Sequence, residues 1–283
     1  MMIRACTLIF ALLVAGAASA QPSFNCAKAG TVIEHAICDN ADLAALDSDM
    51  AAAYGEARKV AKAMDDHEPS LNAQSNLKAA QRAWIGRRDA CEGADAIEAC
   101  IAYEYGDRID LMKLVYQLTP PGAYPVEKEL EKPERAPDAV IAALGQTEDC
   151  DASVTGTGFT AVYDLDKGYQ LWEVECWIAA YNSGSGFVVM PYDRPDEAEV
   201  VHFEAPPGKP DYARDSLTLP NVDLSEGRIY SFHKGRGLAD CGSFRVYGWN
   251  GLSTVRLLEL RVKDDCDEQF TDPDKYPLVY RAW

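Results

Sequence analysis

The feature that most constrains this chain is the placement of its nine cysteines relative to an apolar leader. Residues 1–20 carry Arg4, then an apolar run, then small residues at 18–20, which is the pattern of a secretory signal peptide cleaved after Ala20. Cleavage removes Cys6 and leaves eight cysteines, an even number that indicates disulfide pairing in an oxidising compartment. We therefore expect an exported protein, periplasmic or secreted, whose fold is held by disulfides.

The eight remaining cysteines form two groups of four, one in each half of the chain. They are Cys26, Cys38, Cys91 and Cys100, then Cys150, Cys176, Cys241 and Cys266. Each group allows three pairings, and the sequence does not choose among them. We favour the local pairs Cys26–Cys38, Cys91–Cys100, Cys150–Cys176 and Cys241–Cys266, and a cross-pairing such as Cys26–Cys91 stays open.

Metal binding is the competing interpretation of the first cysteine pair, because Glu34 and His35 lie between Cys26 and Cys38. Structural zinc sites prefer two cysteines separated by two to four residues, with a second matched pair. The gap here is eleven residues. We therefore expect disulfides, with no metal site and no cofactor.

Residues 21–118 have the periodicity of helices. Thr31 and Glu34 have the spacing of a capping box, which predicts the start of a short helix. Apolar residues recur at three- and four-residue steps over 43–64, and two further helices follow before Leu118. The short connections favour antiparallel packing of these helices.

The second half has a different pattern. Residues 119–138 hold five prolines among many charges, which predicts an exposed linker. A short helix near 139–144 precedes aromatic and β-branched runs separated by turn signals such as Asn250-Gly251. The predicted fold class is therefore an α + β multidomain protein: a disulfide-stapled antiparallel helical domain, then an antiparallel all-β domain over 139–283.

The stretches "FNCAKAGTVIEHAICDNADLAALD" and "AQRAWIGRRDAC" combine cysteines with Gln-Arg-x-Trp and Arg-Asp-x-Cys. Over about residues 24–105 the chain resembles the N-terminal domain of the lysozyme inhibitor LprI-like family. The stretches "VECWIAAYNSGSGFVV" and "HKGRGLADCGSFRVYGWNG" are similar to a bacterial secreted domain of unknown function. The first resemblance implies a lysozyme inhibitor or a binder of another cationic protein; the second implies no reaction.

The charge of the chain limits its partners. Without residues 1–20 it has 26 basic and 45 acidic residues, a net charge of −19. Such a surface repels nucleic acid and anionic membranes and favours a cationic protein such as lysozyme. We expect a binding protein of the cell envelope that is not an enzyme. The alternatives are a structural or scaffolding module of the envelope and, with the least support, a cell-wall hydrolase.

The titratable residues show no catalytic arrangement, so we predict no catalytic residue. Paired cysteines leave no free thiol to act as a nucleophile. The four histidines are scattered along the chain: His35, His67, His202 and His233.

Four residues are candidates for a binding patch. Trp84 and Arg88 lie one helical turn apart, and Trp and Arg are common binding anchors. A structural role for this pair, with Trp84 buried on the apolar stripe, is the favoured interpretation. Lys234 and Arg236 are basic exceptions in an acidic chain. Asp47 is expected on a solvated helix face.

Overall fold

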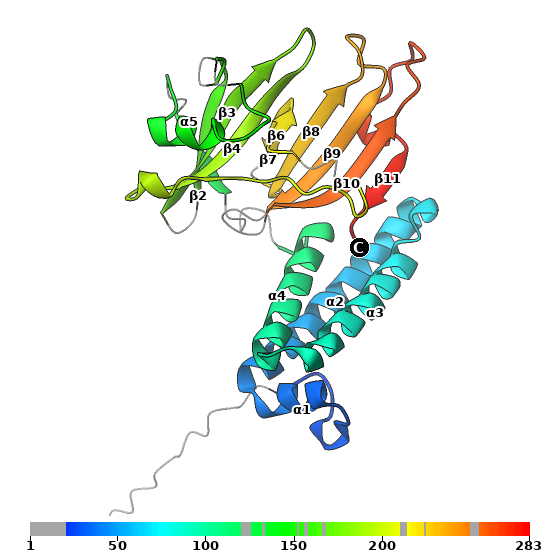
Figure 1. Ribbon diagram of the computed structural model, residues 1–283. Coiled ribbons are helices and arrows are strands. Elements are labelled where there is room, and N and C mark those ends of the chain that lie inside the picture. Colours follow the sequence, from blue (N-terminus) through cyan, green and yellow to red (C-terminus); the bar gives the residue numbers. More distant parts are fainter. Residues whose placement is uncertain are drawn as a thin grey trace, which may run out of the picture.

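The computed structural model describes residues 21–283 except 120–125, 132–133, 152, 156–157, 166–167, 210–213, 224 and 250–254. The expected signal peptide and the turn at Asn250-Gly251 lie outside the described residues. Figure 1 shows a helical bundle at one end of two β-sheets. This confirms the predicted α + β fold class, with a helical first part and an antiparallel β second part.

The helical region begins as its caps predict. Thr31 Oγ1 accepts a hydrogen bond from the Glu34 amide at 3.1 Å, and Glu34 Oε2 accepts one from the Thr31 amide at 3.2 Å. Asn40 caps the next helix through its side-chain oxygen. The elements of this region are η1 (Cys26–Lys28), α1 (Val32–Asp39), α2 (Ala41–His67), η2 (Pro69–Leu71), α3 (Ala73–Ala90), η3 (Cys91–Gly93) and α4 (Ile97–Val115).

The apolar stripes of these helices meet in one core. Ile37, Met50, Leu77, Trp84 and Ile101 are all at most 3% exposed within it. The stripes therefore fix which face each helix buries, as expected for amphipathic helices.

The β region contains two antiparallel sheets. In the first, the strand order is β1-β2-β3-β4-β5, and β6 also pairs with β4. Its strands are β1 (Val126–Glu129), β2 (Thr160–Leu165), β3 (Tyr169–Ile178), β4 (Ser183–Pro191), β5 (Glu199–Val200) and β6 (Ser216–Thr218). In the second, the order is β11-β10-β9-β8-β7. Its strands are β7 (Pro220–Asp223), β8 (Arg228–Lys234), β9 (Gly242–Trp249), β10 (Val255–Lys263) and β11 (Leu278–Arg281).

The stretch expected to be an exposed linker includes strand β1, which pairs with β2 at the edge of the first sheet. Only one of its four residues is apolar, so no alternating apolar pattern marks a strand there. Backbone hydrogen bonding to a neighbouring strand, rather than burial of an apolar face, accounts for this element.

The two sheets enclose an apolar core, to which both contribute aromatic rings. Phe187 and Phe203 come from the first sheet and its following segment, and Tyr247 comes from the second. Helix α5 (Asp138–Leu144) covers the other face of the first sheet, where Val140 and Leu144 are fully buried. The chain passes from β6 to β7 through Leu219, whose φ of 42° is uncommon for a residue other than glycine.

The helical and β regions are joined at the C-terminal end of α4. This end packs on β9 and β10, and Leu258 of β10 belongs to the helical core. Arg228 donates a hydrogen bond to the carbonyl of Leu114, and Arg256 forms an ion pair with Asp107. Arg108, which is 2% exposed, donates to the carbonyl of Trp283 at 2.6 Å. Figure 1 shows the end of the chain beside the helices.

Candidate functional site

Both disulfides of the helical region lie at the end of the bundle farthest from the sheets. Cys26–Cys38 joins η1 to α1, and Cys91–Cys100 joins η3 to α4. Elements α1, η3 and α4 pack against one another here, and in Figure 1 α1 lies at the far tip of the molecule. Two cross-links therefore stiffen one compact surface of short elements.

That surface is acidic. Its exposed carboxylates come from the end of α1, the start of α2, η3 and the segment leading into α4. They are Asp39, Asp42, Glu92, Asp95 and Glu98, which together we call the acidic tip. Asn40 Nδ2 donates to Glu98 Oε2 at 3.0 Å, which ties the α1–α2 corner to α4. The nearest Lys and Arg residues along the chain are Lys28 on η1 and Arg87 and Arg88 in the last turn of α3, and the five carboxylates outnumber them.

Of the predicted patch, Trp84 lies in the helical core and the partly buried Arg88 packs beside it. Trp84 is 2% exposed, and its indole Nε1 donates to the carbonyl of Glu104 at 2.8 Å. The Arg88 guanidinium lies 5.5 Å from the centre of the Trp84 ring and pairs with Asp89. The Trp84 ring is therefore not available to a partner, and it holds α3 against α4.

Asp47 is buried, so its expected place on a solvated helix face is wrong. Its carboxylate accepts a hydrogen bond from Tyr105 Oη at 2.7 Å and another from the Ser23 amide at 2.6 Å. Arg88 Nη1 donates to Tyr105 Oη at 3.2 Å. Burial and the neighbouring Asp47 raise the pKa of Tyr105, so this phenol stays protonated as a donor. The network satisfies a charge that would be costly to bury alone.

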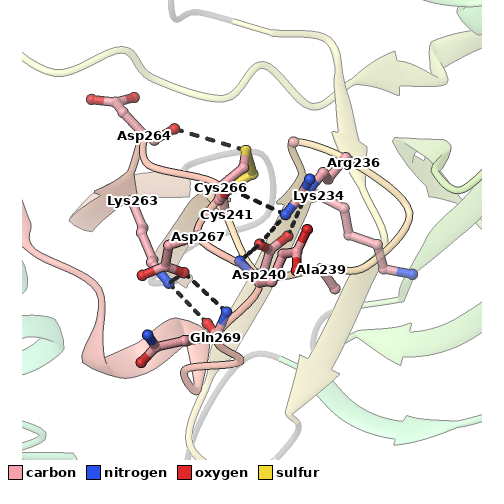
Figure 2. The surroundings of a disulfide bond; sticks show 12 residues. Lys234, Arg236, Ala239, Asp240, Cys241, Lys263, Asp264, Cys266, Asp267 and Gln269 are labelled. Atoms are coloured by element: carbon pink, nitrogen blue, oxygen red, sulfur yellow. Dashed lines mark hydrogen bonds and ion pairs between the residues drawn. A yellow bond between two sulfur atoms is a disulfide. The ribbon is translucent and has the colours of Figure 1, made fainter.

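Lys234 and Arg236 lie in the β region, at the opposite end of the sheets from the helices. Arg236 donates to both carboxylate oxygens of Asp240, at 2.8 and 2.6 Å, and to the carbonyl of Cys266 at 3.1 Å. The Arg236 guanidinium holds the pKa of Asp240 well below its usual range. Figure 2 shows this pair beside the Cys241–Cys266 disulfide. Arg236 thus braces the disulfide loop.

The backbone of Lys234 links the two sheets. Its carbonyl accepts from Asn182 Nδ2 at 3.0 Å, and its amide donates to Asn182 Oδ1 at 3.2 Å. The remaining disulfide, Cys150–Cys176, joins the segment after α5 to β3. The four candidate patch residues therefore lie in two separate places and do not form one surface.

The histidines also lie apart. His35 is on α1, His67 ends α2, His202 contacts Asp215 at 2.6 Å, and His233 faces a cavity between the sheets. Among the described residues, no group of three or more His, Cys, Asp or Glu side chains is placed to hold a metal ion. In the part of the chain that the structure describes, none of the helices has the length and apolar character needed to cross a membrane.

Two families match the chain. Residues 25–118 match the family Lysozyme inhibitor LprI, and residues 110–282 match Protein of unknown function (DUF1176). The two matches overlap in the second half of α4, which is the helix that both regions share. No curated protein and no solved structure matches the chain. With an LprI lysozyme inhibitor domain at its N-terminal end and a match to the second family over more than half its length, the chain belongs to the DUF1176 family.

Proposed function

We propose that this protein is an exported envelope protein that binds a cationic protein of the lysozyme class through its acidic tip and inhibits it. The observation that carries the proposal is the match of residues 25–118 to the lysozyme inhibitor LprI family, because these residues include the whole tip. In this proposal residues 1–20 are removed on export, and the mature chain comprises a helical domain over 21–118, a linker over 119–138 and a β-rich domain over 139–283.

The charge of the tip supports a cationic partner. Its carboxylates are exposed and stay hydrated until a partner binds. Charges of this kind mainly raise the association rate constant. The net charge of −19 of the mature chain adds a long-range attraction for a basic protein. Both effects weaken at high ionic strength. At 0.1 M salt, interactions between exposed charges are largely screened beyond a separation of about 10 Å.

The construction of the tip supports inhibition as well as attraction. Two disulfides and the capping box hold its backbone in one conformation, so a partner does not have to order it. A rigid surface loses less conformational entropy on binding than a flexible one. The disulfides also suit an oxidising compartment outside the cytoplasm.

The test is inhibition of lysozyme by residues 21–283 at low ionic strength, measured as turbidity loss of a cell-wall suspension. A triple variant, Asp39→Asn, Glu92→Gln and Asp95→Asn, should raise the concentration needed for half inhibition by about tenfold, since each change removes one exposed charge contact. A matched control with the same change in net charge is Asp196→Asn, Asp264→Asn and Asp265→Asn, at exposed sites of the β region.

The control should keep most of the inhibition. Equal losses in the two triple variants would show that net charge alone matters, which contradicts a role for the tip. Absence of inhibition by the unmodified protein at low salt, where the attraction is greatest, would contradict the proposed function itself.

A further inference from the structure

A pocket lies where the helical region meets the outer face of the second sheet. Its volume is about 330 Å³, and it is bounded by the end of α4, by strands β8 to β11 and by η6 (Pro273–Lys275). Lysozyme binding through the acidic tip makes no use of this pocket, because the tip lies at the opposite end of the helical region (Figure 1). The pocket size is at the lower end of the range for small-molecule sites.

A row of side chains across four strands forms the floor of the pocket. Tyr230 of β8 lies opposite Val246 of β9 in the register of the two strands. Val246 in turn lies opposite Glu259 of β10, and Glu259 lies opposite Arg281 of β11. Ile229, the neighbour of Tyr230 along β8, is buried in the core that the sheets enclose, so the row lies on the other face of the sheet. All four side chains of the row line the pocket.

Two aromatic rings in this pocket are held in fixed positions. The rings of Tyr230 and Phe244 are nearly parallel, with 6.0 Å between their centres and 13° between their planes, and both side chains are partly exposed. Tyr230 Oη donates to Glu226 Oε2 at 2.6 Å. Burial and this hydrogen bond raise the pKa of Tyr230, so the phenol stays protonated as the donor. Rings that are fixed and partly exposed suit a ligand that has an apolar face.

The charges around the pocket nearly cancel. Among the residues that the structure describes, three carboxylates and two guanidinium groups line it: Glu226, Glu259, Asp274, Arg228 and Arg281. Arg281 Nη1 donates to Glu259 Oε2 at 2.8 Å, and both side chains are largely buried. An anionic ligand would compete with Glu259 for Arg281, and a cationic ligand would compete with Arg281 for Glu259. The lining therefore favours a ligand without charge.

The hydrogen-bonding groups of the pocket include donors and acceptors. Gln117, which follows α4, and Asp274 of η6 are exposed at its edge. The amide of Gln117 both donates and accepts, and the carboxylate of Asp274 accepts. Glu226 can accept further hydrogen bonds beside that from Tyr230, because a carboxylate offers about four lone-pair sites. This set of groups suits hydroxyls, which also donate and accept.

We propose that this pocket binds one ring of a neutral saccharide. The rings of Tyr230 and Phe244 pack against the apolar face of the sugar ring. Glu226 and Asp274 accept hydrogen bonds from its hydroxyl groups, and Gln117 completes the set with a donor and an acceptor. A neutral sugar leaves the buried ion pair between Glu259 and Arg281 intact.

The experiment is an NMR titration of residues 21–283 with glucose, galactose and N-acetylglucosamine as neutral probes. Glucosamine and glucuronate, at a pH where both are charged, are the analogues of the same ring. We expect saturable binding of at least one neutral probe, at least fivefold tighter than binding of either charged analogue. The ring signals of Tyr230 and Phe244 should shift on addition of that probe, because the sugar packs against them.

Two variants assign the binding to the pocket. Phe244→Leu keeps an apolar side chain but removes the aromatic face, and it should weaken binding of the neutral probe at least fivefold. Asp274→Ala should weaken it at least threefold. Asp274 is exposed, so its substitution keeps the test valid even where Phe244→Leu disturbs the fold. The matched controls Phe270→Leu and Asp264→Ala, at exposed sites outside the pocket, should leave binding unchanged.

Three results would overturn the proposal: no binding of any neutral probe, binding of a charged analogue at least as tight, or binding that neither pocket variant weakens. The triple variant of the acidic tip should bind the neutral probe like the unmodified protein. Loss of sugar binding in that variant would place the sugar at the tip and would also overturn the proposal. Absence of lysozyme inhibition would leave it standing, so this pocket and the lysozyme-binding tip can fail independently.

Discussion

At one end of the helical region, two disulfides fix short elements that have no sheet to pack against. At the other end, no disulfide among the described residues holds the last turns of α4, which are fixed instead by burial against β9 and β10, with Arg228 bound to the carbonyl of Leu114. The first end keeps its carboxylates exposed, and the second buries Arg108 and Arg228.

The difference shows that the two ends of one helical bundle can be stabilised in different ways. Covalent cross-links limit the unfolded chain and do not require a large apolar surface, so they suit an end that must stay polar. Non-covalent docking uses apolar area and buried hydrogen bonds, so it suits an end that meets another part of the chain. Fixing α4 at both ends gives the acidic tip a defined direction relative to the sheets.

Removal of the Cys26–Cys38 disulfide should have the largest effect on this contrast. The double variant Cys26→Ser and Cys38→Ser should lower the free energy of unfolding of the helical region by about 2–4 kcal/mol, because the open loop gains conformational freedom when unfolded. The measurement is denaturant unfolding combined with amide hydrogen exchange. Exchange protection should fall in η1 and α1 and stay high in the last turn of α4.

A matched double variant, Cys241→Ser and Cys266→Ser, opens a disulfide in the β region instead. It should leave the protection of α1 unchanged. If the tip variant reduced protection at the α4–β9 junction as much as in α1, the two ends would be one cooperative unit and the contrast would not hold.

Arg228→Met tests the docked end and should have the next largest effect. The change keeps most of the side-chain volume but leaves the buried carbonyl of Leu114 without this donor, at a cost of about 1–3 kcal/mol. Denaturant unfolding gives the loss, and faster exchange at the end of α4 locates it. Arg194→Met, at an exposed ion pair, should change stability by no more than about 1 kcal/mol. Loss of protection in α1 with α4 unaffected would contradict our assignment of Arg228 to the junction.

The sequence predicted the features that depend on neighbours along the chain. The capping box at Thr31 and Glu34 and the apolar face that contains Trp84 are set by spacings of three and four residues, and the structure has both. The sequence also favoured short-range cysteine pairs, and Cys26–Cys38 and Cys91–Cys100 confirm this in the helical region.

Features that depend on partners far along the chain were missed. Asp47 lies between Leu43 and Met50 on the face that α2 buries, but this spacing does not reveal that its partner is Tyr105, 58 positions later. Arg214 precedes β6 and Arg245 lies on β9, and only the fold brings them to one cavity. Strand alternation on β9 was an available sequence signal for the position of Arg245, because it places Arg245 on the same strand face as the buried Tyr247.

Acidification should have the smallest effect and should distinguish the two ends by their chemistry. Glu34 Oε2 accepts hydrogen bonds from the amides of Gly30 and Thr31, at 2.8 and 3.2 Å, and these bonds lower the pKa of Glu34. A carboxyl whose pKa is lowered by folding contributes its full stabilisation above the pKa of the unfolded chain, and this is lost as the pH falls through the folded value. The contact between Arg228 and Leu114 contains no group that titrates in this range.

Amide exchange measured from neutral pH down through the acidic range, corrected for the intrinsic rate, should therefore show Gly30 and Thr31 losing protection before the last turn of α4 does. Glu34→Gln should remove this pH dependence, because the neutral amide cannot titrate. Asp65→Asn is the matched control: its carboxylate caps the start of α3 through the amides of Ala73 and Gln74, away from the tip. Asp65→Asn should leave the response of Gly30 and Thr31 intact, and loss of that response would mean that the two caps are coupled through the bundle rather than acting at separate ends.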